Sequence, residues 1–149
     1  MVSKLVLDTN IVLDWLVFAD ESAEALRDDI AQGRIVALTH DLALEELRRV
    51  LGYKQLRLDA SRQRDVFESY KAATTRATVP EGFAAENLLL PPSFPLCRDP
   101  DDQHFLALAF HAKADALVSK DKAVLKVRRH ARRFGVEIVT LRELPALAS

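Results

Sequence analysis

Cysteine and glycine are scarce in this chain of 149 residues, which has one cysteine, Cys97, and four glycines. A single cysteine excludes an internal disulfide framework and a cysteine-rich zinc site, and it fits a reducing compartment. The glycines lie far apart, at positions 33, 52, 82 and 135, so neither common phosphate-binding glycine loop is present. The Gly-x-Ser-x-Gly elbow and the His-Glu-x-x-His zinc motif are absent too. Any catalytic chemistry therefore has to come from carboxylates.

Long apolar runs and an excess of charge of one sign are missing as well. No run approaches the roughly 20 apolar residues of a membrane-spanning helix, and the first ten residues lack the layout of a signal peptide. Lys and Arg number 21 against 22 for Asp and Glu, so net charge points to no class of partner. We expect one cytoplasmic domain over residues 1–149, without membrane association and large enough to bury about 70% of its unfolded surface.

Short apolar segments alternate with helical ones along the chain. The pattern predicts strands at 5–7, 35–39, 116–119 and 137–140, helices at 11–18, 22–32, 41–51, 60–75, 100–113 and 122–134, and a proline-rich loop over 80–95. Short apolar strands separated by helices are typical of a parallel sheet that is covered on both faces. The sequence thus predicts an α/β fold, a three-layer α/β/α domain with a central, mainly parallel sheet.

Acidic residues stand where the predicted strands end. Asp8 directly follows the first strand in the stretch KLVLDTN, and Asp121 comes two residues after the third. Sites in open parallel sheets form beyond the carboxyl ends of the strands. Glu46 borders the apolar face of helix 41–51, and Asp102 projects toward the apolar face of helix 100–113. Four carboxylates are therefore expected at one edge of the sheet.

A purely structural role is open for each of these positions. Asp8, Thr9 and Asn10 are good helix caps, Asp99 is a good N-cap, and Asp102 in a first turn favours the helix dipole. Four acids around one point, however, repel one another. A hard divalent cation relieves this repulsion, and Mg²⁺ or Mn²⁺ favours carboxylate oxygens and typically works on phosphates.

Basic residues cluster in two places near these acids. Such cations suit a polyanionic substrate, and a solvated helix face is the alternative. Between residues 120 and 133 only Asp121 opposes them. The candidates for binding such a substrate are Lys120, Lys122, Lys126, Arg128, Arg129 and Arg132 and, after Glu46, Arg48 and Arg49. The four histidines are scattered and are expected on the surface, not as ligands or bases.

Four stretches spread between residues 4 and 144 carry a further pattern, in this order: LVLDTNIVLDWL, EELRRVL, DPDDQHFLALAFHAKADALVSKD and VEIVTLREL. In them the chain resembles the PIN-domain ribonucleases, particularly the VapC-type toxins of bacterial toxin–antitoxin modules. By this resemblance the catalytic, metal-binding acids are Asp8, Glu46, Asp102 and Asp121, with Asp99 in a lesser place. The supporting polar residues are Thr9 or Asn10, and Ser119.

The resemblance implies a Mg²⁺- or Mn²⁺-dependent endoribonuclease that cleaves single-stranded RNA, leaving 3′-hydroxyl and 5′-phosphate ends. It also implies a cognate antitoxin as partner, and dimers are common in the family. Lys120 departs from the pattern, because many relatives have a small residue there, and this bears on the pose of Asp121. Two alternatives remain. A non-catalytic domain that binds RNA or a protein would have lost an acid, and an acid-rich α/β phosphatase would want a second Asp two residues after Asp8.

Overall fold

The computed structural model describes residues 2–84 and 86–144. Its centre is a five-stranded sheet in the order β3-β2-β1-β4-β5, and all four strand pairings are parallel. The strands are β1 (Ser3–Leu7), β2 (Ile35–Thr39), β3 (Thr74–Arg76), β4 (Ala116–Val118) and β5 (Ile138–Val139). The four strands that the sequence predicts are all present, β2 in the predicted bounds and the other three in slightly different ones.

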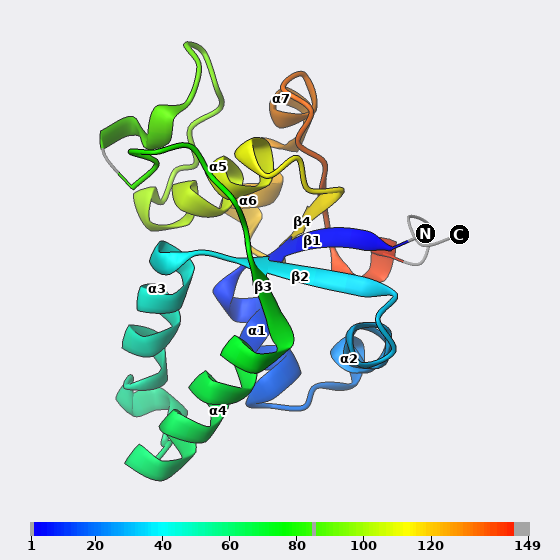
Figure 1. The fold of residues 1–149 in the computed structure, drawn as a ribbon, viewed down its shortest axis with the longest axis vertical. Coiled ribbons are helices and arrows are strands. Elements are labelled where there is room, and N and C mark those ends of the chain that lie inside the picture. Colours follow the sequence, from blue (N-terminus) through cyan, green and yellow to red (C-terminus); the bar gives the residue numbers. More distant parts are fainter. Residues whose placement is uncertain (1, 85, 145–149) are drawn as a thin grey trace.

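Helices cover both faces of this sheet (Figure 1). On one side lie α1 (Thr9–Leu16), α2 (Glu24–Ala31), α3 (Asp41–Leu51) and α4 (Ala60–Ala73), and on the other α5 (Gln103–His111), α6 (Lys122–Leu125) and α7 (Arg128–Arg132). In β1 the side chains of Leu5 and Leu7 belong to the core of the first side, whereas Val6 belongs to that of the second. This alternation is the period of two that a strand imposes. The predicted three-layer α/β/α fold is confirmed.

The strand order creates a switch point between β1 and β4. From β1 the sheet extends through β2 to β3 on one side and through β4 to β5 on the other. The N–H of Asp8 donates to the carbonyl of Val118 across this junction, at 3.1 Å, so the carboxyl ends of the two strands are level. Segments that leave such neighbouring strands in opposite directions open a crevice, which is where sites form in open α/β sheets.

The sequence does not predict β3. Thr74–Arg76 falls inside the helix expected at 60–75, but α4 ends at Ala73 and the next three residues pair with β2. This edge strand is short and largely exposed, and short edge strands without apolar character are one way in which proteins avoid aggregation. A three-residue strand of this kind has no apolar run, so its pattern did not separate it from the helix.

Other helices differ from prediction in their bounds. The helix expected at 122–134 is wrong as one element, because α6 ends at Leu125 and α7 begins at Arg128. The helices expected at 22–32 and 100–113 each begin with a 3-10 turn, η1 (Glu21–Ala23) and η4 (Pro100–Asp102). The loop expected over 80–95 contains a further one, η3 (Glu86–Leu89), and residue 85 lies outside the described residues. Among the described helices, none has the length and apolar character needed to cross a membrane.

Candidate active site

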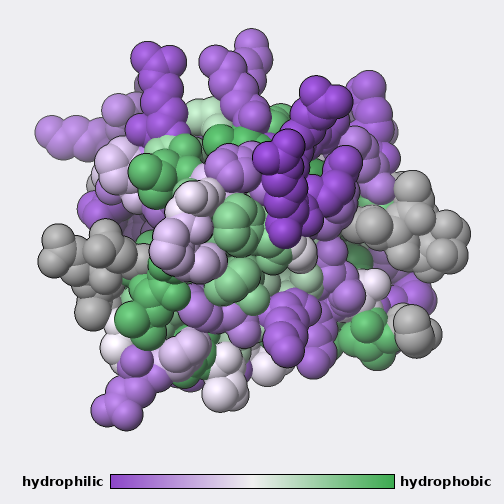
Figure 2. Space-filling model, turned by 90° about the horizontal axis from the view of Figure 1, so that it is seen from above, coloured by the Kyte–Doolittle hydropathy of each residue, from purple (hydrophilic) through white to green (hydrophobic). Residues whose placement is uncertain are grey.

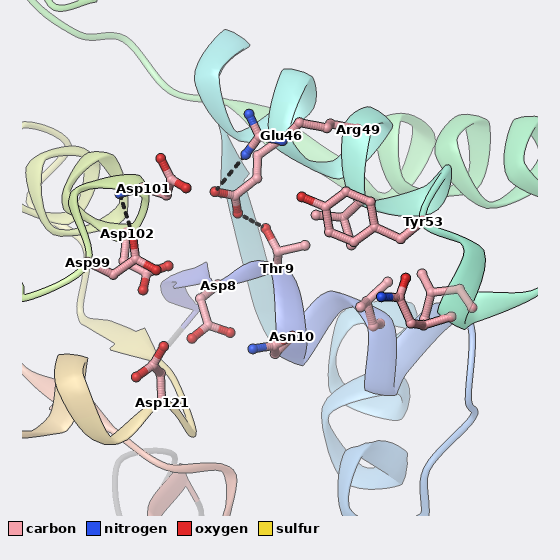
Figure 3. A pocket seen from close by; sticks show the side chains of 14 residues that line it. Asp8, Thr9, Asn10, Glu46, Arg49, Tyr53, Asp99, Asp101, Asp102 and Asp121 are labelled. Carbon is pink, nitrogen blue, oxygen red and sulfur yellow. Dashed lines mark hydrogen bonds and ion pairs between the residues drawn. The ribbon is translucent and has the colours of Figure 1, made fainter.

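A pocket of about 330 Å³ opens at the switch point between β1 and β4 (Figure 3). Its acidic lining residues come from four separate parts of the chain and point toward one another. They are Asp8, Glu46, Asp99, Asp101, Asp102 and Asp121. The structure thus brings together all four acids that the sequence predicts at this edge, along with the lesser candidate Asp99.

Asp8, at the end of β1, is 3% exposed. Its Oδ1 accepts a hydrogen bond from the N–H of Ile11 at 3.0 Å and caps α1, whereas its Oδ2 accepts one from the hydroxyl of Ser119. Burial raises the pKa of Asp8 to about 6, and the charges of Asp121 and Glu46 act in the same direction. The capping role and the role in the pocket therefore coexist on one side chain.

Glu46 reaches the pocket from α3, where it is buried while its neighbour Glu45 is exposed. The hydroxyl of Thr9 donates to Oε2, and His104 Nε2 lies 3.4 Å from Oε1. Burial alone would raise the pKa of Glu46, but these two hydrogen bonds and the charges of His104 and Arg49 outweigh it and lower the pKa. Thr9 therefore orients a carboxylate of the pocket, which is a supporting role of the kind expected.

Asp102 lies where η4 meets α5, and its side chain caps no helix. Burial, and then the charges of the surrounding acids with Asp121 foremost, raise the pKa of Asp102 to about 7. Asp99 does cap η4, since its Oδ1 accepts a hydrogen bond from the N–H of Asp101 at 2.9 Å. Asp101 also lines the pocket but is exposed, so Asp102 is the partly buried acid of the three that has no capping role.

Asp121 completes the set from the segment after β4. Its Oδ1 accepts from the N–H of Ala123 at 2.8 Å and caps α6, and its own N–H donates to Ser119 Oγ at 3.0 Å. Ser119 is fully buried, so one hydroxyl joins Asp8 to the backbone of Asp121. This is the supporting contact that the sequence predicts for Ser119.

The donor set fits a hard divalent cation. Carboxylates are the ligands that Mg²⁺ and Mn²⁺ prefer, and the raised pKa of Asp102 reflects burial and repulsion that a cation would offset. Within residues 2–84 and 86–144, no three His, Cys, Asp or Glu side chains are close enough together to hold one ion directly. Mg²⁺ usually keeps several waters and takes one or two carboxylates, so the open spacing of these acids suits it.

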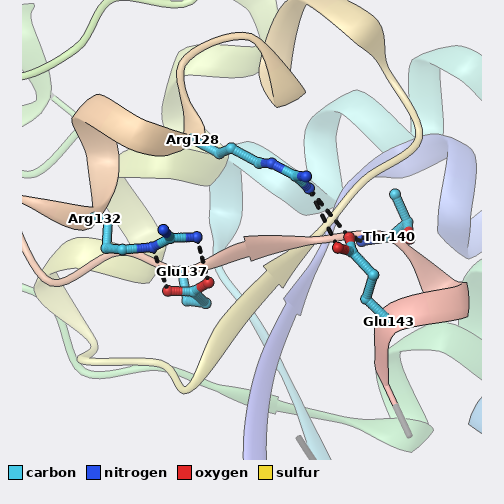
Figure 4. Close-up of polar contacts among 5 residues, drawn as sticks. All are labelled: Arg128, Arg132, Glu137, Thr140 and Glu143. Atoms are coloured by element: carbon cyan, nitrogen blue, oxygen red, sulfur yellow. Dashed lines mark hydrogen bonds and ion pairs between the residues drawn. The ribbon is translucent and has the colours of Figure 1, made fainter. Parts of the chain in front are cut away.

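Two of the basic residues of α7 form salt bridges with glutamates. Arg128 donates to Glu143 at 3.1 Å, and Arg132 pairs with Glu137 at 3.0 Å (Figure 4). The expectation that Asp121 alone opposes the basic run holds along the sequence but is wrong in space. On the face seen in Figure 2 the most hydrophilic side chains gather over α7. Between residues 120 and 132, the exposed members of the predicted set without such a salt bridge among the described residues are Lys122, Lys126 and Arg129.

Three other basic candidates have distinct surroundings. The Nζ of Lys120 lies 2.8 Å from Oδ2 of the buried Asp14, and Lys120 does not line the pocket. Its long side chain therefore does not disturb the hydrogen bond between the Asp121 N–H and Ser119 Oγ. Arg48 stacks over the ring of Phe67, 4.6 Å from its centre. Of the eight predicted basic residues, all within the described part of the chain, Arg49 is the one that lines the pocket.

Sequence reasoning missed His104 and Tyr53, two residues of this region. All four histidines were expected on the surface, which is wrong for His40, buried to 9% exposure, and for His104, whose side chain is 12% exposed and contacts Glu46. Tyr53, which also lines the pocket, was not considered. It follows Glu46 by seven residues, close to two helical turns, and that spacing was the signal for it. Asn10 lines the pocket as predicted.

Comparisons with known proteins bear on this geometry. The family model described as PIN domain matches residues 4–123, which include every acid of the pocket. No curated protein matches the chain. Among solved structures, the chain aligns with one chain of VapBC2 from Rickettsia felis, a structure in which VapBC2 is bound to a DNA fragment from its promoter. The TM-score is 0.59 and the sequence identity 11%, and the alignment covers 92% of this chain and 98% of that chain. At this identity the likeness shows the fold.

The family match extends over most of the chain and includes the strand ends that supply the acidic pocket. PIN domains are generally nucleases. The fold of the VapBC2 chain agrees with this assignment over nearly the full length of both chains. The chain therefore belongs to the PIN domain family.

Proposed function

We propose that this protein is a Mg²⁺- or Mn²⁺-dependent endoribonuclease that hydrolyses phosphodiester bonds of single-stranded RNA, and that it is the toxin of a toxin–antitoxin pair. The observation that carries the proposal is the convergence of Asp8, Glu46, Asp102 and Asp121 on one pocket at the switch point of a PIN fold. Their mutual repulsion is the physical requirement for a cation.

Each acid has a defined part in this proposal. Asp8, Glu46, Asp102 and Asp121, with Asp99 in a lesser place, would hold the cation, one or two of them directly and the others through its waters. When bound, a divalent cation activates water and stabilises the charge that builds on the phosphoryl oxygens. Ser119 fixes the rotamer of Asp8, and Thr9 and His104 fix that of Glu46. Preorganised ligands of this kind do not have to reorient during the reaction.

The choice of RNA rests on the resemblance to VapC-type toxins, and the pocket is compatible with it. Arg49 is a cation on the pocket wall, 3.9 Å from Glu46, where it can meet a substrate phosphate. Exposed Lys122, Lys126 and Arg129 offer further phosphate contacts. Cleavage would leave 3′-hydroxyl and 5′-phosphate ends and would take place in the cytoplasm.

The partner proposed is a cognate antitoxin. The VapBC2 chain from Rickettsia felis comes from a complex of two kinds of protein on DNA from their promoter, and it shares the fold of this chain. A homodimer is proposed as well, because dimers are common among the proteins that the sequence resembles. The upstream reading frame provides a direct check, since a small DNA-binding protein encoded there is what an antitoxin gene would specify.

The two alternatives have less support. A non-catalytic domain is expected to lack an acid, and this chain retains all four around one pocket. A phosphatase that forms a phosphoaspartate wants a second Asp two residues after Asp8, where Asn10 stands, and the family match favours a nuclease.

The test is cleavage of a panel of single-stranded RNAs with Mg²⁺, with Mn²⁺ and with EDTA. Cleavage that requires the cation, and a loss of about 10²-fold or more in Glu46→Gln, is the expected result. Glu45→Gln is the matched control, because Glu45 is the exposed neighbour of Glu46 on the same helix and should retain wild-type activity. Full activity after exhaustive removal of metal, or equal losses in the two variants, would refute the proposal.

A further inference from the structure

The pocket has a second half that the four acids do not explain. Beyond Glu46 its wall changes character, from carboxylates to one cation, one amide, one aromatic ring and aliphatic side chains (Figure 3). The residues of this half are Leu13, Arg49, Val50, Tyr53, Gln55 and Leu56. A site that held only a metal ion and a phosphate would not need such a wall.

One face of α3 links the two halves. Arg49, Val50 and Tyr53 lie three, four and seven positions after Glu46, which places the four residues in a row along a helical path. The N–H of Tyr53 donates to the carbonyl of Val50 at 2.9 Å, so the chain keeps close to the helical path past the end of α3. At 1.5 Å per residue the row is about 10 Å long. An aromatic ring therefore stands within reach of a nucleotide whose phosphate lies at Glu46.

Tyr53 is unusual among the aromatic residues of the chain. It is 46% exposed and lines the pocket, whereas Trp15 and Tyr70 are buried in the core and Phe18, which is also exposed, lies outside the pocket. The aliphatic side chains of Leu13 and Val50 line the same half of the pocket. An exposed ring with aliphatic neighbours is the kind of platform on which an unpaired base stacks, and such stacking tolerates any base.

Arg49 and Gln55 supply polar groups to the same pocket as this ring. A hydrogen bond to the hydroxyl of Tyr53, and then the charge of that group, raise the pKa of the Arg49 guanidinium. The guanidinium lies 3.9 Å from Glu46 and lines the same pocket as Tyr53, where it can meet a phosphate oxygen. The Gln55 amide both donates and accepts, which is what the edge of a base requires.

We infer that this half of the pocket is a base-binding subsite, in which Tyr53 stacks on an unpaired base one or two nucleotides from the cleaved phosphate. The inference rests on the proposed function, since it places the scissile phosphate at the acids. A paired base is already stacked between its neighbours, so the subsite selects single strands over duplexes. Tyr53 is then a specificity-determining residue, and Gln55 contacts the edge of the same base.

The test couples one side chain to one base. RNA oligonucleotides with a known cut site carry an abasic residue at each position around that site, one at a time, and kcat/KM is measured for wild type and Tyr53→Ala. We expect one abasic position to lower the wild-type value by about 5- to 150-fold, the range of one base–aromatic stack. Tyr53→Ala should show a similar loss on intact RNA and less than a twofold further loss on the abasic RNA.

Two further variants separate stacking from other roles. Tyr53→Phe keeps the ring but removes the hydroxyl bonded to Arg49, so it should stay within about threefold of wild type if stacking is the function. Phe18→Ala removes an aromatic side chain that is 54% exposed outside the pocket and should change nothing. Equal losses in Tyr53→Phe and Tyr53→Ala would mean that Tyr53 positions Arg49, and the inference would be wrong.

Binding measurements keep this test independent of cleavage. The same oligonucleotides are titrated into wild type and Tyr53→Ala with Ca²⁺ in place of Mg²⁺. If the abasic position weakens RNA binding by wild type but not by Tyr53→Ala, and RNA is never cleaved, the subsite stands and the proposed nuclease activity fails. If RNA is cleaved but every abasic effect is equal in the two proteins, the nuclease activity stands and the subsite fails. Absence of both binding and coupling overturns the subsite.

Discussion

Two charged regions of this molecule contrast with each other: the acidic pocket at the ends of β1 and β4, and the basic helices α6 and α7. In the pocket, carboxylates from four parts of the chain face one another, with Arg49 as the cation on its wall. On α7, Arg128 and Arg132 are each paired with a glutamate from the segment around β5. One region concentrates like charge, and the other has distributed it into pairs.

The contrast shows which charges are available to a ligand. Burial and then the neighbouring acids raise the pKa of Asp102, so keeping this carboxylate ionised in the folded protein costs free energy. Exposed salt bridges such as those of α7 contribute little, about 0–1 kcal/mol each, and cost little to break. A cluster of like charges therefore favours a cation as ligand, whereas a cluster of pairs needs none.

The largest effect is expected from removing the acid that most strongly feels this repulsion. Asp102→Asn should lower cleavage by about 10³-fold, the order found when a group that stabilises transition-state charge is lost. Asp101→Asn should stay within about tenfold, because Asp101 is exposed and its backbone, rather than its side chain, bonds to Asp99. Single-turnover cleavage at saturating Mn²⁺ measures both. Equal losses would show that the inward aim of Asp102 has no special role.

The next effect separates paired from unpaired cations. Lys122→Gln, Lys126→Gln and Arg129→Gln together should lower RNA affinity about tenfold or more at 50 mM salt and reduce the salt slope by about 2, or 0.7 per phosphate. The double variant Arg128→Gln, Arg132→Gln should change the slope by less than about 0.7, because both side chains already hold glutamates. Binding isotherms at several salt concentrations give both slopes. A larger effect from the paired arginines would contradict this ranking.

Neither the triple variant of the unpaired cations nor the double variant of the paired arginines should affect the chemical step. Interactions that are equal in the ground and transition states do not change kcat. The rate at saturating RNA is expected to stay within roughly tenfold of wild type in both variants. A drop in that rate beyond tenfold would place these residues at the reacting phosphate instead.

Much of the fold was predictable, because the strands that build its centre are apolar runs at the right intervals. Leu5–Leu7, Ile35–Thr39 and Ala116–Val118 stand out in this way, and Asp8 and Asp121 follow from them as residues at strand ends. Thr74–Arg76 did not stand out, since an edge strand with exposed side chains has no apolar signal. The break between α6 and α7 has no proline or glycine to mark it.

The charge pairing was not predictable, for a different reason. Glu137 and Glu143 lie 5 and 15 residues beyond the arginines that they hold, and a sequence does not say that β5 brings them back. The same holds for His104, which meets Glu46 from a position 58 residues away. Local patterns give the direction of a side chain, whereas its partner depends on how the layers pack.

A smaller effect concerns the stability of the metal-free pocket. The pKa values of Asp8 and Asp102 are raised to about 6 and about 7 by burial and by neighbouring acids. A raised carboxyl pKa means that the folded state binds its proton more tightly than the unfolded one. The free energy of unfolding should therefore fall as pH rises from about 4 through 7, when these groups ionise in the folded protein.

Asp102→Asn tests this sign. In EDTA at pH 8 it should exceed wild type in unfolding free energy by about 1 kcal/mol, a value discounted because Asp102 is only half-buried. That difference corresponds to about 2–4 °C in Tm, and it should vanish near pH 4. Thermal melts across this pH range provide the measurement. A variant that melts lower than wild type at pH 8 would show that the acids do not destabilise the fold.

The smallest effect on RNA binding is expected when the salt bridges of the basic region are removed by replacing their glutamates. Glu137→Gln with Glu143→Gln keeps the size of both side chains but releases Arg128 and Arg132. Since an exposed pair holds its partners by only about 0.2–1 kcal/mol, RNA affinity should rise by about two- to fivefold. The salt slope should steepen by up to about 1.4, twice 0.7 for two more phosphates. Glu24→Gln with Glu45→Gln removes two exposed negative charges elsewhere and controls for the change in net charge. If both changes raised affinity equally, pairing would not be what withholds these arginines from RNA, and the contrast between the two regions would reduce to their net charge.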